Sequence, residues 1–254
     1  MEKLVYLVGA GPGAADLLTL RAVRILEGAK AILYDRLVNP DILAYCPASA
    51  YRLCVGKEKG NHHVPQERIH ELLLTCLEEH STVIRLKGGD PSIFSRMGEE
   101  IEFLKSHGVR CEVVPGITAA LGSAASLGFS LTHRDHASRL IFHTGHSRDC
   151  KNRQKSKNEN RLRKEDLEQT THVFYMSITR MEQICQELVQ GTSDHSIPAL
   201  IVERTTCPEQ RSFLGTLGTI ASIAKEQNVS SPAILIIGNT LRQLYRSQFK
   251  ISSF

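Results

Sequence analysis

The first residues that could support chemistry form a glycine-rich turn after an apolar run near the start of the chain. Gly9, Gly11 and Ala14 in LVGAGPGA satisfy the G-x-G-x-x-G/A spacing. Asp35 ends the next apolar run, as the acidic residue of a dinucleotide fingerprint would. Pro12 opposes a phosphate loop, because it removes a backbone N–H where a pyrophosphate needs donors. A turn that only lets a helix pack close to a strand explains the spacing equally well.

Two further glycine turns follow apolar runs in the same half of the chain. Gly88, Gly89 and Asp90 in LKGGDPSIFSR come after the run that ends at Leu86, and the turn in VPGITAALGSAA follows the run that ends at Val114. Glycine can adopt φ > 0 in such turns, and the proline after Asp90 restricts the backbone. The recurrence indicates a site rather than one packing turn.

The elements that must position these turns alternate between strand and helix patterns. Apolar runs predict strands, and helical periodicity between them appears in residues 18–29 and 65–80. The predicted strands are 4–8, 31–34, 51–55, 82–86 and 111–114. Such alternation implies a parallel sheet with crossover helices, and ligands of these sheets lie beyond the carboxyl ends of the strands. We therefore expect the glycine turns to line one cleft.

The second half predicts another α/β unit, interrupted by a polar stretch. Almost no apolar residue occurs between Ser147 and Gln169, so we expect a solvated insertion at about 147–166. Predicted strands and helices continue after it as 171–176, 178–190, 197–203, 211–217, 217–227 and 232–238. The sequence thus predicts an α/β fold of two domains, residues 1–134 with the glycine loops and residues 135–254 with the insertion.

Composition excludes several classes of protein. Of 254 residues, 41% are hydrophobic and 23% charged, as in ordinary globular proteins. No apolar run approaches the roughly 20 residues of a membrane span, so we expect a cytoplasmic protein without a membrane partner. The seven cysteines form no C-x-x-C pair or His/Cys cluster, which predicts free thiols and no metal site. A net charge of +4 without basic–aromatic runs argues against nucleic acid.

Several motifs together resemble one enzyme family, the uroporphyrinogen-III C-methyltransferases, which are S-adenosylmethionine-dependent tetrapyrrole methylases. They occur in the family's order from about Leu4 to Gly238: VGAGPG, LLTL, YDRLV, VGKEKGNHHVPQ, RLKGGDPSIF, VPGITAA, LTHRDHAS, TGH, FYM and SPAILIIG. The resemblance implies two α/β domains with the active-site cleft between them, and a homodimer. It also implies two methyl transfers to uroporphyrinogen III that give precorrin-2, for sirohaem or cobalamin biosynthesis.

The resemblance assigns the glycine loops to S-adenosyl-L-methionine, which has no phosphate, so that Pro12 is no longer anomalous. The residues implied at this cofactor are Pro12, Gly88, Gly89, Asp90, Ile93, Thr118, Ala119, Met176 and Thr205. By itself, Asp90 could equally be a turn former.

The resemblance also implies a catalytic pair, Asp35 in YDRLV and Lys57 in VGK. The alkylated macrocycle must lose a proton, for which Asp35 is the candidate base. Lys57 is the candidate proton donor or substrate anchor. From the residues alone, Asp35 could instead cap a turn before Asn39, and Lys57 could be a solvated charge.

Basic residues in the motif loops suit a macrocycle rich in carboxylates. The expected substrate contacts are Arg36, Lys59, His62, His63, Lys87, Arg96, His133 and Arg134. Some of these side chains can be ordinary solvated charges.

The chain departs from the family pattern at a few loop positions. Ala14 replaces an acidic residue, and the remaining departures replace glycines common in the family, namely Ser95, Met97, Ser177 and Thr205. A Cβ at Thr205 could crowd the adenosine. The catalytic pair and the GGDP motif are intact.

Other functions remain open at this point. Related enzymes include precorrin methylases and diphthine synthase, whereas the full YDRLV and VGK motifs favour the uroporphyrinogen enzyme. An inactive tetrapyrrole-binding homologue and a dinucleotide oxidoreductase are alternatives of other classes.

Overall fold

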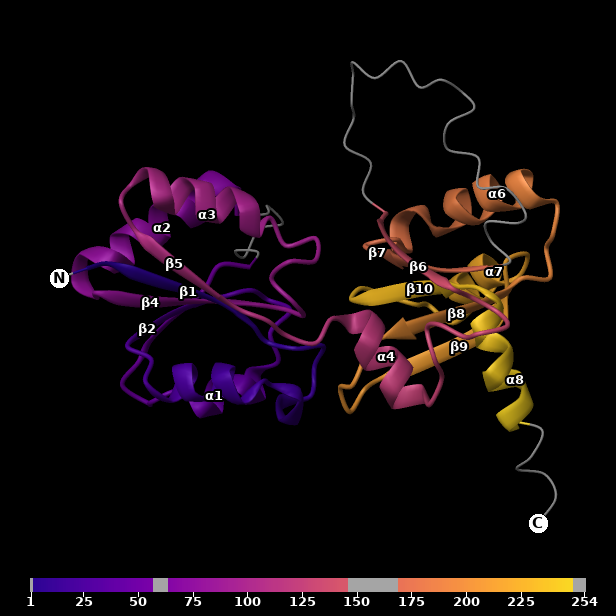
Figure 1. Cartoon of the computed structure of the whole chain (residues 1–254), viewed down its shortest axis with the longest axis horizontal. Helices are drawn as coiled ribbons and strands as arrows, with labels where there is room; N and C mark the ends of the chain where they lie inside the picture. Colours follow the sequence, from indigo (N-terminus) through magenta and orange to yellow (C-terminus); the bar gives the residue numbers. More distant parts are fainter. Residues whose placement is uncertain (1, 57–63, 146–168, 249–254) are drawn as a thin grey trace, which may run out of the picture. The chain divides into compact units, whose positions relative to one another are not determined.

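The chain forms two compact units, Met1–Ala119 and Ala120–Phe254, each with its own five-stranded sheet (Figure 1). The computed structural model describes residues 2–56, 64–145 and 169–248. The expected insertion at about 147–166 lies outside these residues, and so does the catalytic candidate Lys57.

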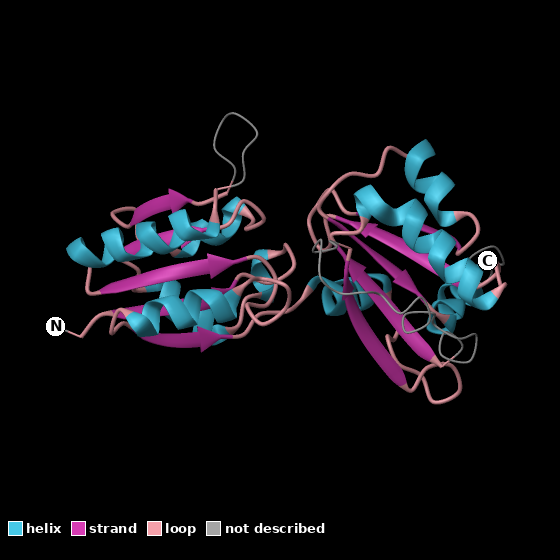
Figure 2. Cartoon of the chain, turned by 90° about the horizontal axis from the view of Figure 1, so that it is seen from above, coloured by secondary structure: helices cyan, strands magenta, loops and turns pink. Residues whose placement is uncertain are grey.

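The sheet of the first unit is wholly parallel and has the strand order β3-β2-β4-β1-β5, which confirms the predicted strand–helix alternation. In Figure 2 its arrows point the same way. Its strands are β1 (Leu4–Gly9), β2 (Ala31–Tyr34), β3 (Tyr51–Cys54), β4 (Thr82–Lys87) and β5 (Arg110–Val114). Gly9 pairs with Lys87 and Val8 with Val114, so the glycine turns leave the sheet at one edge.

Helices cover both faces of this sheet (Figure 1). One face packs on α1 (Leu20–Glu27) and the short 3-10 helix η2 (Pro40–Tyr45), and the other on α2 (Gln66–Glu79) and α3 (Met97–Ser106). The Thr19 hydroxyl caps α1 by accepting from Ala22 N at 3.1 Å. A further 3-10 turn, η1 (Ala15–Leu17), follows the first glycine loop.

Strand alternation divides the apolar residues between the two faces. Ile84 and Leu86 of β4 join the core under α1, and Val83 joins the core under α2 and α3. Arg85 and Lys87 continue the alternation of Val83, so two cations point into the face that α3 covers.

The second unit has a mixed sheet with the order β6-β7-β10-β8-β9. Only the β6–β7 pairing is parallel within it; the other neighbours are antiparallel. Its strands are β6 (Arg139–Thr144), β7 (Thr170–Tyr175), β8 (Pro198–Glu203), β9 (Arg211–Thr216) and β10 (Ala233–Ile237). Its helices are α4 (Ala119–Leu127), α6 (Met181–Thr192), α7 (Ile220–Glu226) and α8 (Arg242–Gln248), with 3-10 turns η3 (Ile178–Arg180) and η4 (Asn239–Leu241).

The division between the units falls earlier than the boundary at residues 134 and 135 that the sequence predicts. Helix α4 bonds to the second sheet: Ala120 N donates to the Tyr175 hydroxyl at 3.2 Å, and the Ser123 and Thr205 hydroxyls lie 2.8 Å apart. The polar turn at 133–136 therefore lies inside the second unit, because α4 packs with the strands that follow it.

The described part of the chain contains no helix with the length and apolar character of a membrane span.

Candidate functional site

The glycine turns of the first unit pack backbone against backbone where the strands end. A Cβ on Gly9 would lie 2.6 Å from Gly116 N, and a Cβ on Gly116 would lie 2.9 Å from Gly9 Cα and also overlap Gly89 O. Gly11 and Gly89 form a two-residue antiparallel bridge, with N···O distances of 3.1 and 2.8 Å. Their φ values of +75° and +70° favour glycine.

In the first loop, this packing occupies the backbone N–H groups that would have to bind a phosphate. Ala10 N donates to Lys87 O at 2.8 Å and Gly11 N to Gly89 O at 3.1 Å, and Pro12 has no N–H. The loop is therefore a poor pyrophosphate cradle, despite its fingerprint spacing.

Both carboxylate oxygens of Asp90 bond to the loops themselves. Oδ1 accepts from Ser92 N at 2.7 Å and from the Ser92 hydroxyl, and Oδ2 accepts from Gly116 N at 2.9 Å. Asp90 thus joins the second glycine turn to the third. Its fixed negative charge further disfavours a phosphate at this place.

Other residues expected at the cofactor extend these turns. Ile93 N donates to Asp90 O at 3.1 Å, Thr118 is buried, and Pro12, Gly88 and Ala119 are partly exposed. A Cβ on Gly89 would have only Thr118 Cα nearby, at 3.9 Å, so the open side of Gly89 leaves room for a ligand.

Asp35 stands at the carboxyl end of β2 and faces β4. Its Oδ1 accepts from Arg85 Nη2 at 2.5 Å, and its side chain is 30% exposed. The turn that follows is capped by Asn39, whose Oδ1 accepts from Asp41 N at 3.0 Å. The Asp35 carboxylate bonds to Arg85 and does not cap η2, and its side chain is partly open to solvent.

Behind Asp35 lies a buried charge cluster that we name the β4–α3 cluster: Arg85, Lys87, Glu100 and Gln66. Glu100 Oε1 accepts from Arg85 Nε at 3.2 Å and Gln66 Nε2 at 3.1 Å, and Oε2 accepts from Lys87 Nζ at 2.8 Å. The side chains of Arg85 and Glu100 are 2% and 0% exposed.

Burial shapes the protonation of this cluster. Burial alone would raise the pKa of Glu100, but Arg85 and Lys87 outweigh it and hold that pKa below its ordinary value. Burial, reinforced by Arg85, lowers the pKa of Lys87 against the opposing effect of Glu100. Lys87 is thus an internal cation, and this position gives no support to the substrate contact expected for it.

The other expected substrate residues lie in different environments. Arg36 is exposed beside Asp35, and Arg96 is exposed but bonded twice to Glu99, at 2.9 and 2.5 Å. In the second unit, Arg134 is exposed and His133 stacks on His136 with 4.6 Å between ring centroids. Lys59, His62 and His63 lie outside the described residues, as Lys57 does.

The expected cofactor residues of the second unit are Met176 and Thr205. Met176 follows β7 with φ +52° and is 39% exposed. Thr205 is buried and its hydroxyl bonds to Ser123, so in the second unit it holds α4 to the loop after β8.

The departures from the family pattern have structural consequences. Ala14 precedes η1 without a side-chain cap, where an acidic residue could provide one. The Ser95 hydroxyl donates to Pro91 O, and the buried Ser177 hydroxyl donates to Phe174 O at 3.3 Å. Met97 begins α3 and packs on its core.

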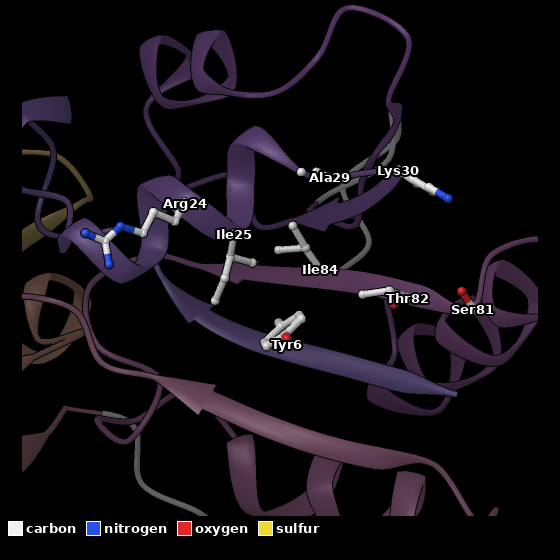
Figure 3. Close-up of a pocket in the computed structure, with 9 residues that line it drawn as sticks. Tyr6, Arg24, Ile25, Ala29, Lys30, Ser81, Thr82 and Ile84 are labelled. Carbon is white, nitrogen blue, oxygen red and sulfur yellow. The ribbon is translucent and has the colours of Figure 1, made fainter. Parts of the chain in front are cut away.

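A pocket of about 300 Å³ lies away from these loops, between α1 and the amino ends of β2 and β4 (Figure 3). Tyr6, Ile25 and Ile84 meet at its centre, whereas Arg24 and Lys30 point away from it. It shares no residue with the expected site, so we assign it no role. Among the described residues no group of His, Cys, Asp and Glu side chains could hold a metal ion.

Sequence reasoning missed Arg85, Glu100 and Gln66. The available signal was the alternation in TVIRLK, which puts two cations two residues apart on one face of an otherwise apolar strand. Such a pair requires a buried anion.

Comparisons with known proteins agree with this architecture. The family model described as Tetrapyrrole (Corrin/Porphyrin) Methylases matches residues 4–221. The siroheme synthase of Stutzerimonas stutzeri (strain A1501) is 46% identical over 242 residues, which are 94% of this chain and 50% of the relative. The chain thus spans about half the length of the curated relatives it matches.

Solved structures match the chain over nearly their own full length. The uroporphyrin-III C-methyl transferase of Thermus thermophilus, complexed with S-adenosyl homocysteine, superposes with a TM-score of 0.76 at 38% identity. The match covers 94% of this chain and 98% of that one. A cobalt precorrin-4 methyltransferase superposes with a TM-score of 0.78 at 25% identity, over 94% and 95% of the two chains. The chain therefore belongs to the tetrapyrrole methylase family.

Proposed function

We propose that this chain is a uroporphyrinogen-III C-methyltransferase. It transfers two methyl groups from S-adenosyl-L-methionine to uroporphyrinogen III and gives precorrin-2, for sirohaem or cobalamin biosynthesis. The observation that carries the proposal is a solvent-accessible carboxylate, Asp35, held by Arg85 at the sheet edge where the glycine loops leave. A sequence identity of 38% to the Thermus enzyme, over 94% of this chain, supports the choice of substrate.

The glycine loops suit a cofactor without phosphate. The N–H groups of Ala10 and Gly11 already donate to backbone carbonyls of the neighbouring segment at Lys87 and Gly89, and Asp90 adds a carboxylate beside these turns. S-adenosylmethionine supplies a methyl group made electrophilic by its sulfonium. The residues we propose around it are Pro12, Gly88, Gly89, Ile93, Thr118 and Ala119; Asp90 shapes the loops, and Met176 and Thr205 stay predictions from the resemblance.

In this proposal Asp35 takes the proton that the alkylated macrocycle must lose. Its Oδ2 has no described partner, since Arg85 bonds to Oδ1. A carboxylate anchored on one oxygen keeps a fixed orientation and can accept the proton on the other. Lys57 remains the predicted proton donor or substrate anchor.

Positive side chains at the loops would hold the carboxylates of the substrate. We retain Arg36, Arg96, His133 and Arg134 for this role, together with Lys59, His62 and His63, and we remove Lys87 because it is buried against Glu100. Arg96 would have to share its guanidinium between Glu99 and the substrate.

A precorrin methylase is the second candidate. The precorrin-4 enzyme has a TM-score of 0.78, against 0.76 for the Thermus enzyme, so fold similarity does not choose between substrates. The higher identity to the Thermus enzyme, 38% against 25%, favours uroporphyrinogen III.

Mass analysis of the tetrapyrrole after incubation with labelled S-adenosylmethionine tests the proposal. Uroporphyrinogen III should gain two labelled methyl groups. Labelling of a precorrin but not of uroporphyrinogen III would support the second candidate, and labelling of neither would leave a binding protein. Calorimetry should show binding of S-adenosylhomocysteine and none of NAD.

We also propose a cytoplasmic homodimer that binds neither nucleic acid nor membrane. The described cysteines Cys46, Cys54, Cys76, Cys111, Cys185 and Cys207 are free thiols, as a reducing compartment favours. Light scattering of the purified chain tests the dimer, and a mass of one chain would contradict it. Cell fractionation tests the compartment, and vesicle and nucleic-acid binding assays test the two expected absences.

A further inference from the structure

Stability alone does not explain why the β4–α3 cluster behind Asp35 consists of charged residues. Arg85 and Glu100 are almost fully buried, and so is Lys87. Removing such ions from water costs several kcal/mol each, and well-packed apolar residues often stabilise a core as well. Because this buried ionic cluster ends at a solvent-accessible carboxylate, its role is to be sought in the orientation of that carboxylate.

Each nitrogen of the Arg85 guanidinium has its own partner. Nε donates to Glu100 at 3.2 Å, Nη1 to Leu86 O at 3.3 Å and Nη2 to Asp35 at 2.5 Å. The first two contacts fix the plane of the guanidinium, since that group is rigid. The third contact then transmits this orientation to Asp35.

Glu100 is in turn held on both oxygens. Gln66 and Arg85 share Oε1, and Lys87 occupies Oε2. Two cations and two carboxylates thus alternate from Lys87 through Glu100 and Arg85 to Asp35, with no net charge. Without Glu100, two cations would face Asp35 alone.

We infer that Glu100, on α3, positions Asp35 through Arg85. The inference rests on the proposed role of Asp35 as the base. Glu100 orients the guanidinium, and its negative charge offsets that of Arg85, so that Arg85 holds Asp35 in a fixed orientation. Glu100 is therefore a positioning residue and does not touch the substrate.

The titratable groups around this contact come from three elements. Arg85 and Lys87 lie on β4, Glu100 on α3, and His70 on α2, with its Nε2 3.3 Å from Gln66 Nε2. Arg36 follows Asp35 in the chain. His70 contacts the cluster only through Gln66, whereas Arg85 bonds to both Glu100 and Asp35. A change at Glu100 therefore acts on Asp35 mainly through Arg85.

The test is the pH dependence of kcat for Glu100→Gln at saturating concentrations of both substrates. Gln keeps the shape but removes the negative charge. We expect kcat to fall roughly 10- to 100-fold, the loss that a small misplacement of a reacting group causes. The acid limb of the profile should move to lower pH, because Asp35 would then be the only carboxylate beside Arg85. KM and the affinity for S-adenosylhomocysteine should stay within about twofold.

Glu203→Gln provides a matched control in the second unit. Glu203 is also buried, with Arg211 at 2.8 and 2.5 Å and the Ser230 hydroxyl at 2.6 Å. This substitution should lower the melting temperature and leave the acid limb where it is. An equal loss of kcat in both variants would mean that only stability matters and would overturn the inference.

The companion variant Asp35→Asn separates the inference from the proposed function. Wild-type kcat in Asp35→Asn would refute the base. A large loss there, with kcat and the acid limb unchanged in Glu100→Gln, would refute the positioning role alone. If Glu100→Gln does not fold, Glu100→Gln combined with Lys87→Met removes one buried charge of each sign, and a lower kcat is again expected; wild-type kcat would overturn the inference.

Discussion

The loops that follow the strands are built differently in the two units. In the first unit, Gly9, Gly89 and Gly116 let three turns meet backbone to backbone, and Gly11 and Gly89 supply the positive φ values. In the second unit, Gly145 makes a similar close approach, since its Cβ would lie 2.5 Å from Met176 O. Side-chain-bearing residues adopt left-handed φ values in both units, at Phe94 and Arg96 in the first and at Met176, Arg204 and Thr206 in the second.

The buried ions differ in the same sense. The β4–α3 cluster of the first unit continues to Asp35, whereas Glu203 in the second unit ends in a pairing with Arg211, whose side chain is 46% exposed. Shape and charge are thus fixed tightly where the catalytic base is proposed.

The largest expected effect is that of Gly116→Ala. Its Cβ would overlap backbone atoms of Gly89 and Gly9, which cannot rotate away. We expect a loss of at least about 3 kcal/mol in the free energy of unfolding, measured by urea denaturation.

Gly98→Ala is the matched control, because a Cβ there meets nothing within 4 Å. It lies in α3 and should stabilise the protein by about 0.5–1 kcal/mol. Equal effects of the two substitutions would contradict the tight packing of the glycine turns.

The next effect separates buried from exposed cations. Lys87→Met should cost about 2 kcal/mol of stability, because Glu100 loses one of its two cations but keeps Arg85. Arg36→Ala should leave stability unchanged and raise KM for the tetrapyrrole. The distinction would be contradicted if denaturation showed a loss of stability in Arg36→Ala and steady-state kinetics showed a raised KM, with wild-type stability, in Lys87→Met.

A smaller effect concerns His143 in the second unit, whose Nε2 lies 2.9 Å from His172 Nδ1. Burial lowers the pKa of His143 below its ordinary 6.5. The unfolded chain therefore binds a proton that the folded state resists, so stability is greatest above pH 6.5 and falls as the pH decreases below it.

His143→Gln should flatten this dependence in denaturation series from pH 7.5 to 5. The exposed His195 offers a control, since His195→Gln should preserve the wild-type slope. An unchanged slope in His143→Gln would assign the pH dependence to another group.

The smallest effect is relief of backbone strain at Arg204, which has φ +48° and an exposed side chain. Arg204→Gly should stabilise by about 0.5 kcal/mol, because the relief slightly exceeds the entropy that glycine loses on folding. Destabilisation by more than about 1 kcal/mol would show that the Arg204 side chain makes contacts that matter.

Periodicity and turn residues predicted much of the fold. The runs at 4–8, 31–34 and 82–86 are strands, and they end together because parallel register aligns Gly9 with Lys87. The helix expected at 65–80 is observed as Gln66–Glu79. Helix α3 was missed although Met97, Ile101 and Leu104 have helical spacing, and α4 was missed because small residues dominate it.

The site was predictable in its loops but not in its interior. Asp35 was proposed as the base from the YDRLV motif of the resemblance, and burial of Lys87 was missed because a basic residue beside a glycine turn resembles a ligand contact. Only the packing of α3 on β4 reveals Glu100 as its partner. Asp90 likewise needed coordinates, since a turn former and a ligand residue have the same sequence signature.

The most direct test of the central claim is kcat for Asp35→Asn with uroporphyrinogen III, alongside calorimetric affinity for S-adenosylhomocysteine. Asn retains the shape and can still accept from Arg85, but it cannot take up the proton. We predict a loss in kcat of roughly 10² to 10⁴, with cofactor affinity unchanged. Wild-type kcat, or a loss of cofactor affinity that matches the loss of rate, would contradict the assignment of Asp35 as the base.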